Sequence, residues 1–211
     1  MMGEYEDVFG AAEAAAALQD RIRALRGRRT PPAAETRAVV TPPLSDRRDH
    51  VDGPESASLA MVVFGAYGGP ESRALGGLLK RLREAHPAAL RVAWRHFADP
   101  DANPRSTSLA LAAEAAASEG RFWSMNRELL ALHHYDLVGV QHAARRAGVD
   151  FDRLLSLVRA GVGADRVVDD VASGLASSVL HAPTLFVNGE RFDGGLDAEA
   201  VWAAMQADLH G

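Results

Sequence analysis

The 211-residue sequence contains no cysteine, which excludes disulfides, thiolate chemistry and cysteine metal ligands. It also lacks any run of 18 apolar residues, the length that a membrane-spanning helix needs. Basic residues do not predominate, and the net charge of −5 disfavours binding to nucleic acid or to an anionic membrane. With 47% hydrophobic and 24% charged residues, the composition is that of one globular domain with some extra length.

Several sequence motifs of enzymes are absent as well. There is no H-x-x-x-H metal motif, no dinucleotide or phosphate-binding glycine loop, and no G-x-S-x-G nucleophile turn. His133 and His134 are adjacent and would face different directions on a helix. We therefore expect no metal and no cofactor. The first residues, M-M-G-E-Y-E-D, lack the basic-then-apolar pattern of a signal peptide, so a cytoplasmic location is expected.

The stretch from residue 59 to residue 82 predicts a buried strand that turns sharply into a helix. The apolar run Leu59 to Phe64 has the length and β-branched content of a strand. Glycines break the run, and Pro70 follows at a first helical position, where its missing N–H costs nothing. Helical spacing then resumes in four leucines at positions 75, 78, 79 and 82.

The following residues predict a second strand, a long helical segment and a hairpin. Residues 90–97 alternate apolar and polar, which predicts a strand with one better-covered face, parallel to the first strand. Helices are then expected at 109–119, 122–132, 137–147, from a cap at Asp150 onward, and at 165–180. Strands at 184–187 and 190–192 flank the hairpin turn Asn188-Gly189, and a final helix is expected at 196–209.

The N-terminal part carries two different compositions. Residues 11–25 are rich in alanine and predict a helix with a narrow apolar stripe, interpreted either as a solvated appendage or as a partner-binding or self-associating helix. Residues 28–50 contain four prolines and predict an extended linker, with a short strand at 37–40.

The turn after the first strand resembles the active-site region of the DsbA-like branch of the thioredoxin superfamily, which typically reads F-G-D-Y-x-C-P-x-C-R. Five residues match this motif: Phe64, Gly65, Tyr67, Pro70 and Arg73. Gly69 and Ser72 occupy the two cysteine positions, and Ala66 replaces the usual acidic residue. The chain is therefore similar to a redox enzyme whose reactive atoms are missing.

Further segments carry the same resemblance in the same order. Arg95, His96 and Phe97 match the second strand, and A-A-E-A-A-x-x-x-G-x-F-W-x-M resembles the helical insertion. The run P-T-L-F-V-N-G matches the segment in which the family carries its cis-proline, here Pro183. The run D-R-R-D-H-V-D-G-P at 46–54 resembles the lead-in of DsbA-like domains associated with NhaA-type sodium/proton antiporters.

The resemblance implies an α/β thioredoxin fold of DsbA type, ordered βαβ–helical insertion–ββα and preceded by a helical extension. Residues 1–45 would be the extension and proline-rich linker. Residues 46–211 would be the thioredoxin domain, with the insertion at about 105–180. The residues Gly69, Pro70, Glu71 and Ser72 form a degenerate catalytic motif without a nucleophile, since Ser72 is more typical of a helix cap and Glu71 of a first-turn carboxylate.

The implied function is that of a binding or regulatory module. The helix N-terminus offers N–H groups, and Ala182 before Pro183 is expected to present backbone groups to an extended peptide. The expected ligand is an extended peptide, a partner protein or a glutathione-like tripeptide, with contacts at Tyr67, Gly69, Ser72, His181, Ala182 and Pro183. The alternative is a glutathione-dependent transferase or isomerase of the kappa type, which usually has serine where this chain has Gly69.

Overall fold

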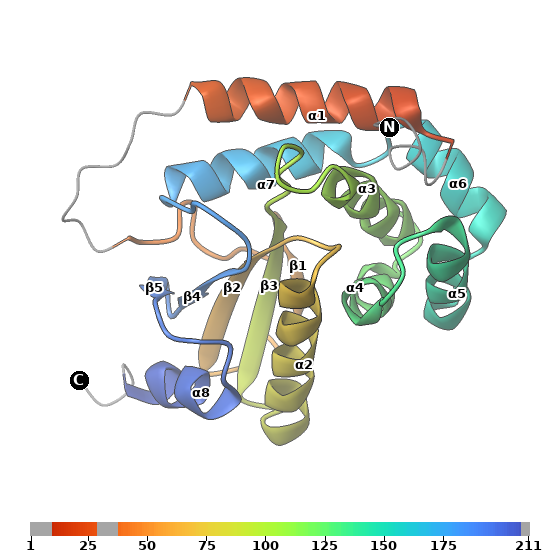
Figure 1. Ribbon diagram of the computed structural model, residues 1–211. Coiled ribbons are helices and arrows are strands. Elements are labelled where there is room, and N and C mark those ends of the chain that lie inside the picture. Colours follow the sequence, from red (N-terminus) through yellow and green to blue (C-terminus); the bar gives the residue numbers. More distant parts are fainter. Residues whose placement is uncertain (1–9, 29–37, 208–211) are drawn as a thin grey trace.

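A computed structural model describes residues 10–28 and 38–207. Within these ranges a five-stranded sheet is surrounded by eight helices (Figure 1). In chain order the elements are α1 (Ala12–Gly27), β1 (His50–Asp52), β2 (Leu59–Gly65), α2 (Pro70–Ala85), β3 (Leu90–His96), α3 (Arg105–Ala117), α4 (Phe122–Ala131), α5 (Leu137–Ala147), α6 (Phe151–Arg159), α7 (Ala164–Ala176), β4 (Thr184–Val187), β5 (Glu190–Phe192) and α8 (Ala198–Ala207).

The sheet has the strand order β1-β3-β2-β4-β5. Strands β2 and β3 are parallel and joined through α2, with Leu59 opposite Leu90 and Gly65 opposite His96, as the sequence predicted. The sequence predicted one better-covered face for this strand, but both faces of β3 are covered. Six of its seven residues are buried, because α7 packs against β3 and helices cover both faces of the sheet.

Five helices, α3 to α7, lie between β3 and the hairpin β4–β5. The hairpin turn is the expected one, since Asn188 and Gly189 both have positive φ, 50° and 93°. Helix α7 ends at Ala176, before the predicted Leu180, because Ser178 adopts a φ of 59° that no helix continues through. Helix α8 begins after Asp197, whose side chain accepts a hydrogen bond from the Ala200 N–H. The predicted end of this helix at Leu209 lies outside the described residues.

Strand β1 was not predicted; His50 lay at the end of the segment interpreted as a linker, and Val51 and Asp52 lay in the lead-in at 46–54. It pairs antiparallel with β3, with Val51 opposite Ala93. The strand is short and carries a histidine and an aspartate, so no apolar run marks it. Of the strand predicted at 37–40, Arg37 lies outside the described residues, and Val39 forms one isolated bridge to Glu190.

The interpretation of α1 as a solvated appendage is wrong. Leu18 and Ile22 are buried on α3, α6 and α7, which lie beneath α1 in Figure 1. Gln19 Nε2 donates to Thr107 Oγ1 at 3.2 Å, and Arg26 pairs with Asp99 at 3.0 Å. The apolar stripe of α1 is therefore part of the core and is not available to a partner. The expected division near residue 45 remains a prediction.

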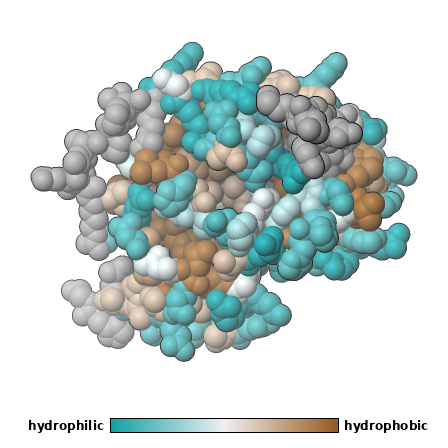
Figure 2. Space-filling model, viewed as in Figure 1, coloured by the Kyte–Doolittle hydropathy of each residue, from teal (hydrophilic) through white to brown (hydrophobic). Residues whose placement is uncertain are grey.

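Hydrophilic residues cover most of the face shown in Figure 2, with apolar residues between them. No helix within the described ranges is long and apolar enough to cross a membrane.

Candidate functional site

Two glycines, Gly65 at the end of β2 and Gly68 in the turn after it, occupy positions that no other residue fits. At Gly65 a side chain would collide with the Trp94 ring, 2.2 Å from the position of a Cβ atom. Gly68 has a φ of +105°, and its Cβ would lie 2.6 Å from Asn103 Nδ2. Asn103 fixes this turn, since its Nδ2 atom donates to the carbonyls of Tyr67 and Gly68 at 3.0 and 3.3 Å.

Helix α2 begins at Pro70, as predicted, with Gly69 extended at its N-cap. Ser72 Oγ donates to the Gly69 carbonyl at 2.9 Å and accepts from the Gly69 N–H at 3.4 Å. Its other partner among the described residues is Tyr135 Oη, at 3.4 Å. No histidine or carboxylate is bonded to Ser72 there, so the geometry is that of a helix cap and offers no base to activate a nucleophile.

The loop before β4 lies beside the same turn. Thr184 pairs with Phe64 across the sheet, which brings Pro183 next to the C-terminal end of β2. The Ala182–Pro183 peptide bond is cis, as the resemblance implied. Thr184 Oγ1 donates to the His181 carbonyl at 2.7 Å and holds the loop at its start.

The turn, the α2 N-terminus and the proline loop enclose a cavity of about 440 Å³. All the predicted contact positions line it: Tyr67, Gly69, Ser72, His181, Ala182 and Pro183. Pro70, Glu71 and the turn residues Asp99 and Asn103 line it too. The degenerate motif and the proline loop therefore face one shared space, and neither Tyr67 nor His181 closes it.

Tyr67 lies differently from a ligand-contacting side chain. Its side chain is 1% exposed, its ring stacks on Trp94 at a centroid distance of 5.3 Å, and its Oη atom bonds Asn126 Nδ2 at 2.9 Å. Burial raises the pKa of Tyr67 well above its usual value. The Tyr67 side chain is therefore held in the core, and Asn103 Nδ2 donates to the Tyr67 carbonyl.

A buried group of polar residues lies behind the motif, and the sequence did not indicate it. Glu114 Oε1 lies 2.8 Å from His50 Nε2 and 2.8 Å from His96 Nε2. Burial disfavours the Glu114 carboxylate, but the two imidazoles overcome this and lower its pKa to about 2. The His96 N–H donates to Asp170 Oδ2 at 2.9 Å, yet burial raises the pKa of Asp170 to about 6.

These buried groups lie on β1, β3, α3 and α7, and none of them lines the cavity. Their role is to position the elements. No group of three or more histidine, cysteine, aspartate or glutamate side chains in the described ranges is placed to hold a metal ion.

Two positioning residues of the site, Asn103 and Tyr135, escaped the sequence analysis. Tyr135 Oη lies 3.3 Å from Arg73 Nη1 and 3.4 Å from the Gly69 carbonyl, and so fastens α2 to the insertion. Both lie outside the recognised motifs, and an isolated Asn in a connecting turn or an isolated Tyr after a helix carries no pattern that marks it.

Comparison with known proteins gives two kinds of similarity. No protein-family model matches the chain. It is 35% identical over 200 residues to the Na(+)/H(+) antiporter NhaA 1 of Salinispora arenicola, covering 87% of this chain and 29% of that protein. It is 32% identical over 177 residues to the Na(+)/H(+) antiporter NhaA of Herminiimonas arsenicoxydans, covering 82% of this chain and 28% of that protein. The chain thus spans less than a third of the length of these relatives.

Comparison with solved structures identifies the fold. BdbD from Bacillus subtilis superposes with a TM-score of 0.71 at 18% identity, covering 83% of this chain and all of that one. The thiol-disulfide exchange protein α-DsbA2 from Wolbachia pipientis superposes with a TM-score of 0.62 at 15% identity, covering 92% and 96%. The chain has the DsbA-like thioredoxin fold. It is a cysteine-free form of that fold, related in sequence to a segment of NhaA antiporters.

Proposed function

We propose that this chain is a non-catalytic binding module that takes an extended peptide in the cavity between α2 and the Pro183 loop. The observation that carries the proposal is the open cavity of about 440 Å³ at a motif whose two cysteine positions hold Gly69 and Ser72. A space remains where a redox enzyme of this fold would act, but the reactive atoms are absent.

Backbone groups would make the principal contacts. Neither the N–H nor the carbonyl of Ala182 takes part in a hydrogen bond with the described part of the chain. The first N–H groups of α2, at Glu71 and Ser72, have no partner within the helix. A peptide strand laid along the proline loop would pair with Ala182, and a peptide carbonyl or carboxylate would meet the helix N-terminus.

The partner that we propose is a segment of a sodium/proton antiporter. The support is the sequence similarity to part of two antiporter chains, which indicates that such domains occur joined to a transporter. A cytoplasmic location belongs to this proposal. A similar thioredoxin-like protein from Salmonella enterica is described as periplasmic, so the location needs its own test. A reporter that is active only outside the cytoplasm, fused to the chain, should stay inactive.

A bulky side chain at Gly69 tests the binding site. Gly69 is extended, with a φ of −156°, and a Cβ there would contact only the Glu71 carboxylate, so Gly69→Phe fills the cavity without backbone strain. Gly195→Phe is the matched control, since a Cβ at Gly195 meets nothing within 4 Å. Peptides covering the loops and tails of an NhaA antiporter are titrated by fluorescence polarisation.

We expect one or more peptides to bind, Gly69→Phe to weaken binding by about tenfold or more, and Gly195→Phe to leave it unchanged. Binding that survives Gly69→Phe, or no binding by any peptide, would contradict the proposal. Glutathione is titrated in parallel with an electrophilic substrate, because turnover would favour the transferase instead.

A further inference from the structure

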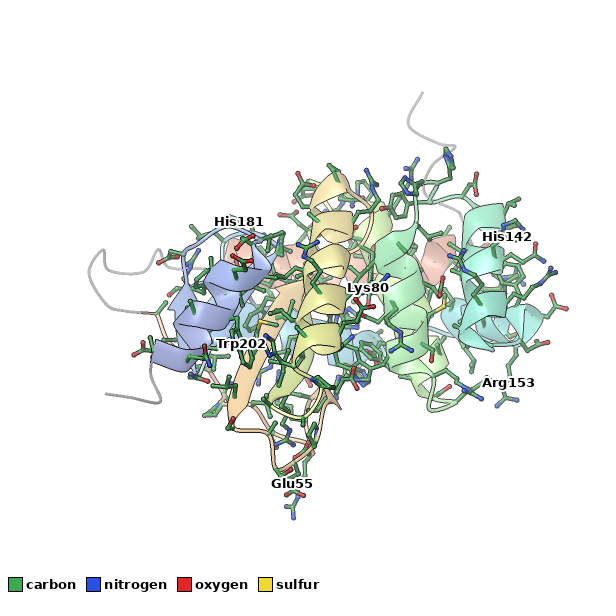
Figure 3. The ribbon with its side chains drawn as sticks, turned by 90° about the horizontal axis from the view of Figure 1, so that it is seen from below. Glu55, Lys80, His142, Arg153, His181 and Trp202 are labelled. Atoms are coloured by element: carbon green, nitrogen blue, oxygen red, sulfur yellow. The ribbon has the colours of Figure 1, made fainter. Side chains whose placement is uncertain are left out.

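A second cavity, of about 520 Å³, lies between α2 and α4. In Figure 3, Lys80 lies on the side of α2 that faces α4, and His181 lies on the other side. We call this second cavity the α2–α4 groove. Of the residues lining it, none except Arg73 belongs to the recognised motif, so the groove is separate from the peptide-binding cavity.

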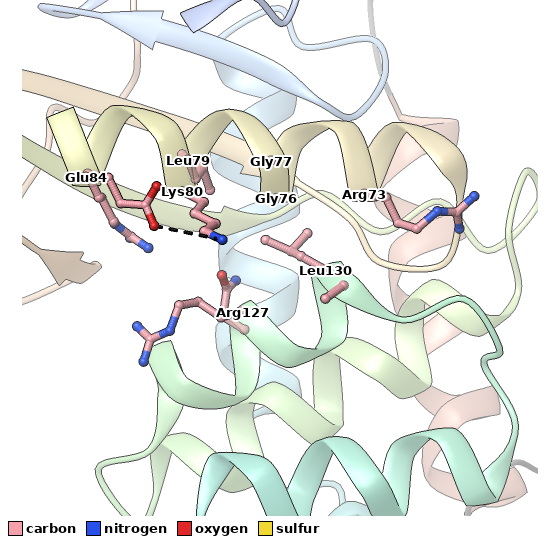
Figure 4. Close-up of a pocket in the computed structure, with 11 residues that line it drawn as sticks. Arg73, Gly76, Gly77, Leu79, Lys80, Glu84, Arg127 and Leu130 are labelled. Carbon is pink, nitrogen blue, oxygen red and sulfur yellow. Dashed lines mark ion pairs between the residues drawn. The ribbon is translucent and has the colours of Figure 1, made fainter.

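The floor of the groove is apolar. Leu79 from α2 and Leu130 from α4 are buried and both line it (Figure 4). A Cβ at Gly76 would lie 3.0 Å from Leu130 Cβ, so the two helices approach closely there. At Gly77 the nearest atom to such a Cβ is Arg81 Nη1 at 3.5 Å, which leaves open space beside the floor. An apolar group of modest size fits this shape.

The rim of the groove is positively charged. It carries the four basic side chains Arg73, Lys80, Arg83 and Arg127 and the single carboxylate Glu84, a net of three positive charges on a chain whose net charge is −5. Glu84 lies 3.9 Å from Lys80, the distance drawn in Figure 4, and both are exposed. A pair this long and exposed neutralises Lys80 only weakly.

Two of these cations have no acidic partner in the part of the chain that the structure describes. Within the described ranges, no carboxylate lies at ion-pair distance from Arg73 or Arg127. The hydrogen-bond partners of their guanidinium groups are hydroxyls, at Tyr135 and Ser124. Arg83 is paired with Asp52 at 2.9 Å, so its guanidinium group is not free to bind a ligand. The rim therefore retains positive charge that an anion would neutralise.

Asn126 adds a buried polar side chain with one unused hydrogen-bonding atom. It lines the groove and is fully buried, with Nδ2 bonded to Tyr67 Oη and with no partner for Oδ1 among the described residues. A tyrosine hydroxyl both donates and accepts, so the Asn126 amide can be reversed while its bond to Tyr67 is kept. The free end can then donate to an oxygen in the groove. An unpaired buried amide is costly, and a ligand would satisfy it.

We propose that the α2–α4 groove binds a small amphipathic carboxylate. Its apolar chain lies on Leu79 and Leu130, and its carboxylate is held by Lys80 and Arg127, with one oxygen in reach of Asn126. An uncharged ligand would leave the rim unneutralised, and an anion without an apolar part would leave the floor uncovered. This site is independent of the peptide-binding proposal, because it lies on another side of α2.

Lys80 is the only lysine in the sequence, which gives the first test. An amine-specific acylating reagent labels Lys80 and the N-terminal amine, and mass spectrometry follows the two rates separately. Decanoate is the probe, and decanol is its uncharged analogue. Decanoate should slow labelling of Lys80 in a saturable manner and leave the N-terminal amine unaffected, whereas decanol should have little effect. Unchanged labelling of Lys80, or equal protection by decanol, overturns the proposal.

Three variants give the second test, read by isothermal titration with decanoate. Gly77→Leu fills the open part of the floor and favours the helix, since leucine has a higher helix propensity than glycine. Arg127→Glu reverses one rim charge. Arg145→Glu makes the same charge change on exposed α5, away from the groove.

We expect Gly77→Leu and Arg127→Glu each to weaken decanoate binding by about tenfold or more, and Arg145→Glu to leave it within about twofold. Circular dichroism confirms folding of each variant. Should one groove variant fail to fold, the other still decides. Equal affinity in wild type and in the folded groove variants, or no saturable binding to wild type, overturns the proposal.

Discussion

Arg95 and Asp49 form a two-point ion pair in which both side chains are fully buried. Arg95 Nε lies 2.8 Å from Asp49 Oδ1, and Arg95 Nη2 lies 2.9 Å from Asp49 Oδ2. Burial opposes ionisation of Asp49, but the bonds from Arg95 outweigh it and lower the Asp49 pKa. Arg95 also donates to the carbonyls of Pro42 and Pro43, so the pair joins the N-terminal lead-in to the central sheet.

Removing the charge of Asp49 should destabilise the fold strongly. Asp49→Asn keeps the volume but leaves the Arg95 guanidinium buried without a counter-charge, and the free energy of unfolding should fall by about 3–5 kcal/mol. Urea denaturation measures this change. The control is Asp20→Asn, which breaks an exposed pair with Arg23 and should change stability by less than about 1 kcal/mol. A similar loss of unfolding free energy in both variants would show that the buried pair contributes no more to stability than the exposed pair.

The packing of α1 makes a second prediction. Ile22, on the inner face of α1, is fully buried, so Ile22→Ala should lower the free energy of unfolding by about 2–5 kcal/mol. Arg28→Ala, at the exposed end of the same helix, should leave stability nearly unchanged. Both are measured by urea denaturation. A solvated appendage would make the two variants alike, and that result would restore the interpretation that the structure overturns.

The sequence allowed the fold to be predicted wherever the signal is local. β2 is a continuous apolar run, α5 ends at a glycine, and the β4–β5 turn reads Asn188-Gly189, so each was placed within a residue or two. The packing of α1 was not predicted, because the narrow stripe of Leu18 and Ile22 on an alanine-rich helix becomes a core face only when α3 and α7 supply the other half. The sequence of α1 alone is equally compatible with a helix exposed to solvent.

The buried polar groups could not be predicted for a related reason. Asp49 and Arg95 are 46 residues apart, and His50 and Glu114 are 64 residues apart. No periodicity relates such partners, and only the tertiary fold brings them together. At the candidate site, the resemblance indicated the turn and the proline loop, which line one cavity. It could not identify Asn103 or Tyr135, which act from the connecting turn and the insertion.

The pH dependence of stability should reveal Asp170. Its pKa in the folded chain is about 6, raised by burial from an ordinary value of 3.8, so the folded state resists ionisation of this carboxyl. The stability of wild type relative to Asp170→Asn is therefore highest below pH 3.8 and declines as the pH rises through 6. The decline should be on the order of 3 kcal/mol, since each pKa unit corresponds to about 1.4 kcal/mol.

Taking the difference between wild type and Asp170→Asn removes the opposite contribution of Glu114. The lowered pKa of Glu114, about 2, stabilises both proteins above pH 4.5 and is lost as the pH falls towards 2. Urea denaturation at a series of pH values gives the two curves. Curves that stay parallel from pH 4 to pH 7 would show that the pKa of Asp170 is not raised in the folded chain.

A cysteine introduced at Gly69 should be unusually acidic. Gly69 is the N-cap of α2, so a thiolate there would receive the N–H groups and the dipole of the helix. The pKa of the Gly69→Cys thiol should lie clearly below the ordinary value of about 8.5, whereas a Gly195→Cys thiol should titrate near 8.5. Thiolate absorbance against pH measures the pKa of each thiol. Equal pKa values in the two variants would mean that the α2 N-terminus does not stabilise a thiolate. The wild-type chain, which has no cysteine, should not accelerate the reduction of insulin above the rate measured without protein.

The most direct test of the proposed function is where a bound peptide contacts the protein. A labelled chain is titrated with the antiporter peptide that binds most tightly, and amide chemical shifts are followed by NMR. We predict that the largest shifts occur at Gly69, Ser72, His181 and Ala182, and that α1 does not respond. Shifts gathered on α1, with the proline loop unchanged, would contradict the account and make the cavity a relic of a redox enzyme.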